Sequence, residues 1–187
     1  LEPANQLLLG RYKISQQLVR DNFQNIYLAQ DTKQHQQAIC IVRRIELNKD
    51  NPRRSVTEID LFKREIEVFG QLSQHHNIAG ILDVFQQEQQ LYLIQEYIGE
   101  NLLANKLKLG QSVGIADALI LILEILKIIQ QLHQHQIVHQ HLDANCFAYR
   151  QDGKLVLVEL GIVARLSATL PQNVVAAAGN DNRHSAK

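Results

Sequence analysis

Short apolar runs alternate with polar turns through the first part of the chain. Strand-like runs begin at Gly10, Ile26 and Ala38. The residues between them, Arg20-Asp21-Asn22 and Asp31-Thr32-Lys33, are typical of tight turns. Apolar runs bounded by such residues indicate β-strands. The pattern therefore predicts a meander of antiparallel strands.

A helix and a hairpin are expected next. Polar residues 48–55 predict a loop, and Thr57-Glu58-Ile59-Asp60 suits the start of a helix. Apolar residues over 61–72 then recur at helical spacing. Two further apolar runs, 81–85 and 91–97, predict the strands of a hairpin.

Two helices are predicted in the following segment, a short one over 102–107 and a long one over 115–136. Residues 118–129 of the long helix are apolar on nearly every face. Such a helix is either buried all round or spans a membrane. Burial is predicted, because the apolar run is short for a span and contains Glu124 and Lys127.

A distinctive stretch, residues 137–165, combines a polar loop with a second hairpin. An apolar entry leads to His139 and the loop. The hairpin over 146–158 is expected to turn at Gln151-Asp152-Gly153, because Asp and Gly tolerate the backbone angles of tight turns. Glu159-Leu160-Gly161 closes the second strand.

Composition narrows the class of protein. The 187 residues suffice for one domain or two small lobes, and the formal net charge of zero argues against a binder of nucleic acid or anionic membrane that works by bulk charge. Arg43 and Arg44 belong to a local basic stretch that is interpreted as a solvated loop. Cys40 and Cys146 are far apart, which favours a reduced, cytoplasmic setting. No secretion signal is visible.

The order of elements resembles the small lobe and the first part of the large lobe of a protein kinase, closest to the bacterial Ser/Thr type. The motifs that carry this resemblance are Phe23 with Ile26-Tyr27-Leu28-Ala29, Phe62-Lys63-Arg64-Glu65 with Leu72, His76-Asn77-Ile78, Leu91-Tyr92-Leu93-Ile94-Gln95-Glu96-Tyr97-Ile98 and Ile137-Val138-His139.

The resemblance implies an α+β fold with a five-stranded antiparallel sheet and one helix in the small lobe, and a partial helical large lobe. The lobes are expected over 1–97 and 98–170, with a flexible tail over 171–187. A complete kinase domain is longer, so the chain is interpreted as truncated at its C-terminal end.

The resemblance also indicates the positions at which a kinase has its nucleotide-binding residues. In this chain those positions hold residues of other types. The three glycine positions of the phosphate-covering loop are Val19, Asp21 and Gln24. The position of the strand lysine that pairs with the phosphates is assigned to Cys40. Its usual partner matches Glu65, which would then lack its cation.

The catalytic positions are replaced in the same way. His141 stands at the position of the base, Cys146 at that of the Asn metal ligand, and Glu159 at that of the magnesium Asp. Asp143 falls where a Lys would hold the γ-phosphate and is expected to hydrogen-bond within its loop. Magnesium prefers hard oxygen ligands, so Cys and His are poor substitutes. A catalytically inactive pseudokinase without a cofactor is therefore predicted.

Packing positions are compatible with a kinase scaffold. By the resemblance, two apolar stacks would join the lobes. The first would use Phe69, Ile81, His139 and Leu160, and the second would use Ile26, Ala38 and Ala148.

Two alternatives stay open. The first is a divergent ATP-binding protein or weak Ser/Thr kinase that uses Glu159 for the metal and Asp143 or His141 for proton transfer. The second is a zinc site at which His141, Cys146 and Glu159 converge. Cys40 would face the same cleft. A disused cleft filled by uncharged side chains is favoured over zinc.

The favoured function is a protein-interaction, regulatory or assembly scaffold. Without the substrate platform of a complete kinase the long helix would lose part of its cover, and exposed apolar patches mark interaction surfaces. A protein partner, or self-association, is expected there, with no nucleic acid and no membrane span. The candidate contact residues are Leu119, Ile122, Leu123 and Leu126.

Overall fold

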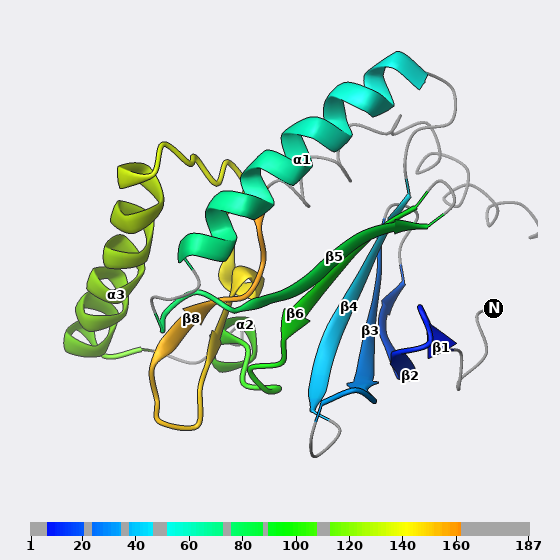
Figure 1. The fold of residues 1–187 in the computed structure, drawn as a ribbon. Coiled ribbons are helices and arrows are strands. Elements are labelled where there is room, and N and C mark those ends of the chain that lie inside the picture. Colours follow the sequence, from blue (N-terminus) through cyan, green and yellow to red (C-terminus); the bar gives the residue numbers. More distant parts are fainter. Residues whose placement is uncertain are drawn as a thin grey trace, which may run out of the picture.

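A curled antiparallel sheet crossed by one long helix forms the larger part of the structure, and two helices with a small hairpin form the rest (Figure 1). The computed structural model describes residues 7–20, 24–34, 38–46, 52–72, 76–87, 90–107 and 113–161. We call residues 7–96 the sheet part and residues 101–161 the hairpin part.

The sheet has six strands in the order β1-β2-β3-β4-β6-β5, and every neighbouring pair is antiparallel. The bounds are β1 Leu7–Leu8, β2 Tyr12–Arg20, β3 Gln24–Asp31, β4 Ile39–Glu46, β5 Ile81–Gln87 and β6 Gln90–Glu96. Five strands were expected, and β1 is the additional one. Leu9 and Gly10 adopt φ of 50° and 62°, which turns the chain back so that Leu8 packs into the core. A two-residue strand has no periodicity that sequence analysis could detect.

Helix α1, Pro52–Leu72, crosses the sheet. It begins five residues before the predicted start, so the loop predicted over 48–55 is wrong from Pro52 onward. Proline is tolerated in the first turn of a helix, because the N–H that it lacks would have no partner there. The predicted apolar spacing is confirmed, since Phe62, Ile66 and Phe69 are all buried.

The hairpin part contains α2, Leu103–Lys106, and α3, Ile115–Gln134. A 3₁₀ turn, η1, follows at Ala144–Cys146, and the hairpin strands are β7, Phe147–Tyr149, and β8, Leu155–Leu157. The predicted turn is confirmed: Gly153 has a φ of 83°, and the Arg150 N–H donates to the Lys154 carbonyl over 2.9 Å. Both helices and the hairpin thus lie where sequence analysis expected them.

In the part of the chain that the structure describes, two apolar clusters make up the core. The central core joins the two parts, because it combines Phe69 and Leu93 of the sheet part with Leu132, Leu157 and Leu160 of the hairpin part. The sheet core lies on the other face of the strands. Its buried members are Leu8, Tyr12, Ile14, Tyr27, Ala29, Cys40, Val42, Tyr92 and Ile94.

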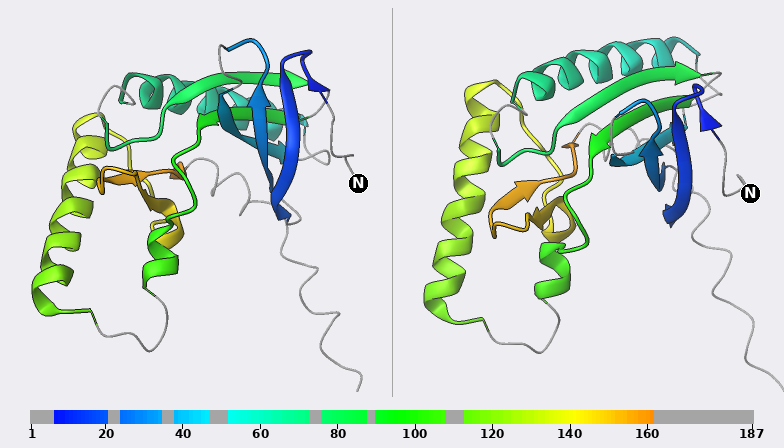
Figure 2. Two further views of the ribbon diagram at one scale, coloured as in Figure 1. Left: turned by 90° about the horizontal axis from the view of Figure 1, so that it is seen from below. Right: turned by 60° about the horizontal axis from the view of Figure 1, so that its bottom comes forward.

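Helix α3 stands at the outer side of the hairpin part (Figure 2). Ile128 and Leu132 are buried in the central core, but Leu119, Ile122, Leu123 and Leu126 are 56%, 50%, 57% and 53% exposed. Within the described residues the helix is therefore not buried all round, and the exposure of these four candidate contact residues fits the expected loss of cover. Among the described residues, no helix is long and apolar enough to cross a membrane.

Candidate functional site

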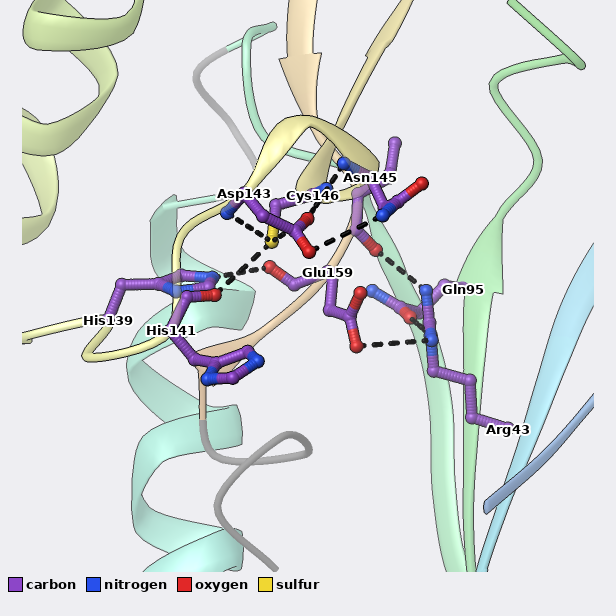
Figure 3. A network of polar contacts seen from close by, with 9 residues as sticks. Arg43, Gln95, His139, His141, Asp143, Asn145, Cys146 and Glu159 are labelled. Atoms are coloured by element: carbon purple, nitrogen blue, oxygen red, sulfur yellow. Dashed lines mark hydrogen bonds and ion pairs between the residues drawn. The ribbon is translucent and has the colours of Figure 1, made fainter. Parts of the chain in front are cut away.

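The candidate site lies where β4 and β6 of the sheet part face the 139–146 loop and Glu159 of the hairpin part (Figure 3). From the sheet part come Arg43 and Gln95. From the hairpin part come polar groups of the loop and of the segment after β8. The labelled residues are His139, His141, Asp143, Asn145, Cys146 and Glu159. The Val158 carbonyl also belongs to the site, because it accepts a hydrogen bond from Arg43.

Arg43 connects the two sides of this site. Its Nε donates to Gln95 Oε1 over 2.7 Å, its Nη2 donates to the Val158 carbonyl over 3.2 Å, and its Nη1 lies 4.0 Å from Glu159 Oε1. The residue is only 6% exposed. Burial lowers the pKa of Arg43, and the negative charge of Glu159 opposes this shift. Arg43, which was interpreted from the sequence as part of a solvated loop, is therefore a buried cation.

Cys40 does not face the site. Its side chain is buried in the sheet core, where its Sγ lies 3.6 Å from the Ala29 carbonyl that accepts its hydrogen bond. Successive side chains of a strand point to opposite faces, so Cys40 and Arg43, three positions apart, are on different faces of β4. The assignment of Cys40 to the cleft is therefore wrong. Burial also raises the pKa of the Cys40 thiol to about 11, as expected of a small buried apolar side chain.

Arg43 was not predicted to lie in this site, because the sequence of β4 is a continuous apolar run followed by basic residues. Such a run does not show which side chains share a face of the strand, and the basic residues resemble the beginning of a loop. The strand continues to Glu46. If the predicted strand had been extended through Arg43 and Arg44, the alternation of side chains would have placed Arg43 and Ile41 on one face and Cys40 and Val42 on the other.

The remaining nucleotide positions that the structure describes lie in β2, β3 and α1. Val19 lies in β2 with an exposed side chain, and Gln24 begins β3. Asp21 lies outside the described residues. Glu65 is half-buried in α1 and is not without a partner.

His139 fixes the loop against the segment that follows β8. Its ring is buried, and its Nε2–H donates to the Glu159 carbonyl over 2.8 Å. The same segment approaches the loop backbone at Gly161, where an added Cβ would lie 2.0 Å from the His139 carbonyl oxygen. This close approach requires glycine at position 161. Phe69 and Leu160 belong to the central core and Ile81 packs against it, as expected of the first apolar stack.

Asp143 organises the loop by hydrogen bonding, which confirms its predicted role. Its Oδ1 accepts from the backbone N–H groups of Asn145, at 2.7 Å, and Cys146, at 3.3 Å, and so caps η1. Burial acts to raise the pKa of Asp143, but the hydrogen bonds from Asn145 and Cys146 outweigh it and lower the pKa.

Cys146 and His141 contribute little reactive chemistry in this arrangement. The Cys146 thiol is buried and donates to the His141 carbonyl over 3.3 Å. Burial raises the pKa of Cys146 to about 12, so the thiol stays protonated at neutral pH. His141 contributes its carbonyl here, while its side chain is exposed.

The zinc alternative finds no support in the described ranges. Within them no three His, Cys, Asp or Glu side chains are grouped so that they could hold a metal ion. Cys40 also lies on the wrong face of β4, as described above. The structure brings Glu159 together with Arg43, rather than with a set of metal ligands.

Comparison with known proteins agrees with this geometry. Residues 12–179 match the profile of the protein kinase domain. Serine/threonine-protein kinase B of Synechocystis sp. is 28% identical over 171 residues, which cover 90% of this chain and 30% of that protein. Serine/threonine-protein kinase PrkC of Bacillus subtilis is 26% identical over 160 residues, which cover 86% of this chain and 24% of that protein.

A third relative, serine/threonine-protein kinase C of Synechocystis sp., is 29% identical over 169 residues, which cover 88% of this chain and 31% of that protein. The chain thus spans less than a third of the length of these relatives. The matched profile covers most of the chain, and the observed α+β fold is the one expected of this family. The chain therefore belongs to the protein kinase family, with bacterial Ser/Thr kinases among its relatives.

Proposed function

We propose that this chain is a catalytically inactive member of the protein kinase family that acts as a protein-interaction module. The observation that carries the proposal is the state of Arg43, the buried cation of the site. Its Nε and Nη2 donate to Gln95 and to the Val158 carbonyl, and its Nη1 lies 4.0 Å from the Glu159 carboxylate. To reach Arg43, the phosphates of a nucleotide would have to displace Glu159. The Glu159 carboxylate would then lose its cation at a largely buried position, which costs free energy.

The groups expected to perform phosphoryl transfer also support inactivity. Transfer requires a positioned base or orienting group and oxygen ligands for magnesium. His141 is exposed and is not a carboxylate, and the Cys146 thiol is buried and protonated. Glu159 is the remaining carboxylate near Arg43, and it is engaged in the ion pair.

A divergent ATP-binding protein or weak Ser/Thr kinase is the second candidate. Two observations favour it: the named relatives are Ser/Thr kinases, and a cation and a carboxylate still face each other in the site. In that function Glu159 would hold the metal, and Asp143 or His141 would take the proton.

Transfer of labelled γ-phosphate from ATP separates the two candidates. The full chain is incubated with ATP and magnesium, alone and with a generic protein substrate, beside a Glu159→Gln variant and an Asp152→Asn control. Asp152 lies in the exposed turn of the hairpin. Inactivity predicts equal background incorporation in all three proteins. Incorporation by the wild type and the control that disappears in Glu159→Gln would establish the second candidate.

The interaction role rests on the outer face of α3, which we define as Leu119, Ile122, Leu123 and Leu126. These side chains form an i, i+3, i+4, i+7 quartet, the spacing with which one helix packs against another. Monomeric soluble proteins rarely expose large contiguous apolar patches. A partner protein or a second copy of the chain would bury this face.

Light scattering over a range of concentrations tests this role. The double variant Leu119→Gln/Leu126→Gln should lower the mean mass of any assembly and the binding of an apolar dye. Leu61→Gln is the matched control, since Leu61 is an equally exposed leucine on α1 (50%). Identical mass and dye binding in the wild type and both variants would contradict the assignment of the interaction to α3.

A further inference from the structure

Two arginines cross the boundary between the sheet part and the hairpin part in opposite directions. Arg43 of β4 reaches the hairpin part, and Arg150, which follows β7, reaches the sheet part. Each meets a carboxylate on the far side, Glu159 and Glu96 respectively. We call these contacts the Arg43 clasp and the Arg150 clasp.

The Arg43 clasp is the more buried. The side chains of Arg43 and Glu159 are 8% and 19% exposed. Besides the ion pair, Nη2 of Arg43 donates to the Val158 carbonyl, so the guanidinium holds both a side chain and the backbone of the hairpin part. Gln95 accepts from Nε and fixes the direction in which the guanidinium points.

The Arg150 clasp gathers three segments of the sheet part. Both Nη atoms of Arg150 donate to the Glu96 carboxylate, with 2.8 Å between Nη2 and Oε2. Nε donates to the His76 carbonyl over 3.2 Å. Glu96 Oε2 also accepts from the Gly80 N–H over 3.1 Å, so the carboxylate ties the end of β6 to the residue before β5.

The two clasps contact the end of β6 on opposite faces of the sheet. Gln95 takes part in the Arg43 clasp and Glu96 in the Arg150 clasp, and adjacent strand residues point to opposite faces. Residues 97–100, just beyond, form the single chain connection between the two parts. Gly99 in this connection has a φ of 123°, a conformation that glycine adopts easily. A single connection of this kind would by itself permit rotation.

We propose that the two clasps act together as a latch that fixes the orientation of the two parts without any bound ligand. The central core already joins the two parts, and the two clasps on opposite faces of β6 would further restrict how far the hairpin part can turn. The latch goes beyond the proposed function, because it concerns how the two parts are oriented in the protein without nucleotide.

Hydrogen exchange of backbone amides tests the latch. Suitable reporters are Ala79 and Leu157, because Ala79 N–H donates to the Leu157 carbonyl and Leu157 N–H donates to the Asn77 carbonyl, each over 2.9 Å across the boundary. A third is Tyr149, whose N–H donates to the Asn101 carbonyl over 2.9 Å beside the connection. Amides of β3 serve as internal references.

The variants are Glu159→Gln and Glu96→Gln, which keep side-chain shape and remove one carboxylate each. Lys154→Gln is the matched control, since Lys154 pairs with Asp152 at 3.2 Å on the surface, inside the hairpin part. The latch predicts that either glutamine variant exchanges about tenfold faster at all three reporters, with β3 unchanged. The control should match the wild type.

Exchange within twofold of the wild type at the reporters, or acceleration only beside the replaced side chain, would overturn the latch. If a glutamine variant does not fold, as checked by circular dichroism, Arg150→Lys provides the same test, because lysine keeps the charge but loses the two-pronged contact. The variants are compared without nucleotide, so the outcome for the latch does not depend on whether the site is active. A change in exchange of the wild type that saturates with ATP and magnesium would count against the inactive site of the proposed function alone.

Discussion

Replacing Gly161 by alanine should destabilise the fold sharply, because the position has no room for a side chain. An added Cβ would lie 2.0, 2.7 and 2.9 Å from the O, C and Cα atoms of His139. All three are backbone atoms, so the overlap can be relieved only if the main chain of the loop or of the Glu159 segment moves. Such movement would also stretch the 2.8 Å hydrogen bond from His139 to the Glu159 carbonyl.

The size of the effect follows from these two contributions. Overpacking in a dense interior costs about 1–3 kcal/mol. The weakened hydrogen bond adds about 1 kcal/mol. The free energy of unfolding should therefore fall by about 2–4 kcal/mol, which lowers the melting temperature of a chain of this size by roughly 5–15 °C.

Thermal unfolding followed by circular dichroism measures this effect, and Gly70→Ala is the matched control. Gly70 lies in α1 and has nothing within 4 Å of an added Cβ. Alanine there should raise the free energy of unfolding by about 0.5–1 kcal/mol through helix propensity. A Gly161→Ala variant that melts at or above the wild-type temperature would refute the close approach of the loop and the Glu159 segment.

Two further properties can be measured on the same protein. Cys40 and Cys146 should resist thiol reagents in the folded state, because burial raises their pKa values to about 11 and about 12 and leaves only about one thiolate in a thousand or fewer at pH 8. Rapid labelling without unfolding would contradict this. Asp31 is held by Arg11 at 2.8 and 2.7 Å, which lowers the pKa of Asp31 below 3.8. Its stabilisation is therefore present above pH 3.8 and is lost as the pH falls through the lowered pKa. Asp31→Asn should cost about 1–3 kcal/mol at pH 7, because Arg11 loses its charged hydrogen-bond acceptor. It should also flatten the acid limb of melting temperature against pH, and an unchanged limb would contradict this.

The elements that depend on local pattern could be predicted from the sequence. Turn residues bounded the strands, and helical spacing identified α1 and α3. The Asp152-Gly153 turn was recognisable because its backbone angles restrict the residues that fit. Asp143 could be expected to hydrogen-bond locally, because Asp often caps the turn that follows it.

The errors concern features that depend on how distant segments meet. Cys40 was assigned to the cleft, and Arg43 was assigned to a solvated loop. The sequence of an apolar strand does not show which of its faces points to the cleft and which to the sheet core until the neighbouring elements are known. The apolar composition of α3 suggested burial on every side, because composition alone does not say how many sides of a helix are covered; the exposure of Leu119, Ile122, Leu123 and Leu126 fits the loss of cover expected from the resemblance. In both cases the missing information was the tertiary arrangement.

We propose that the chain keeps the fold of a protein kinase domain while the contacts of Arg43 close its nucleotide site. A thermal-shift titration with ATP and magnesium tests it most directly, because a ligand that binds only the folded state must raise the melting temperature. We predict a melting temperature that stays constant up to millimolar nucleotide. Binding at a hundred times the dissociation constant would stabilise the fold by about 2.7 kcal/mol, which is roughly 5–10 °C for this chain. A saturable rise of that size, abolished by Glu159→Gln, would contradict the account.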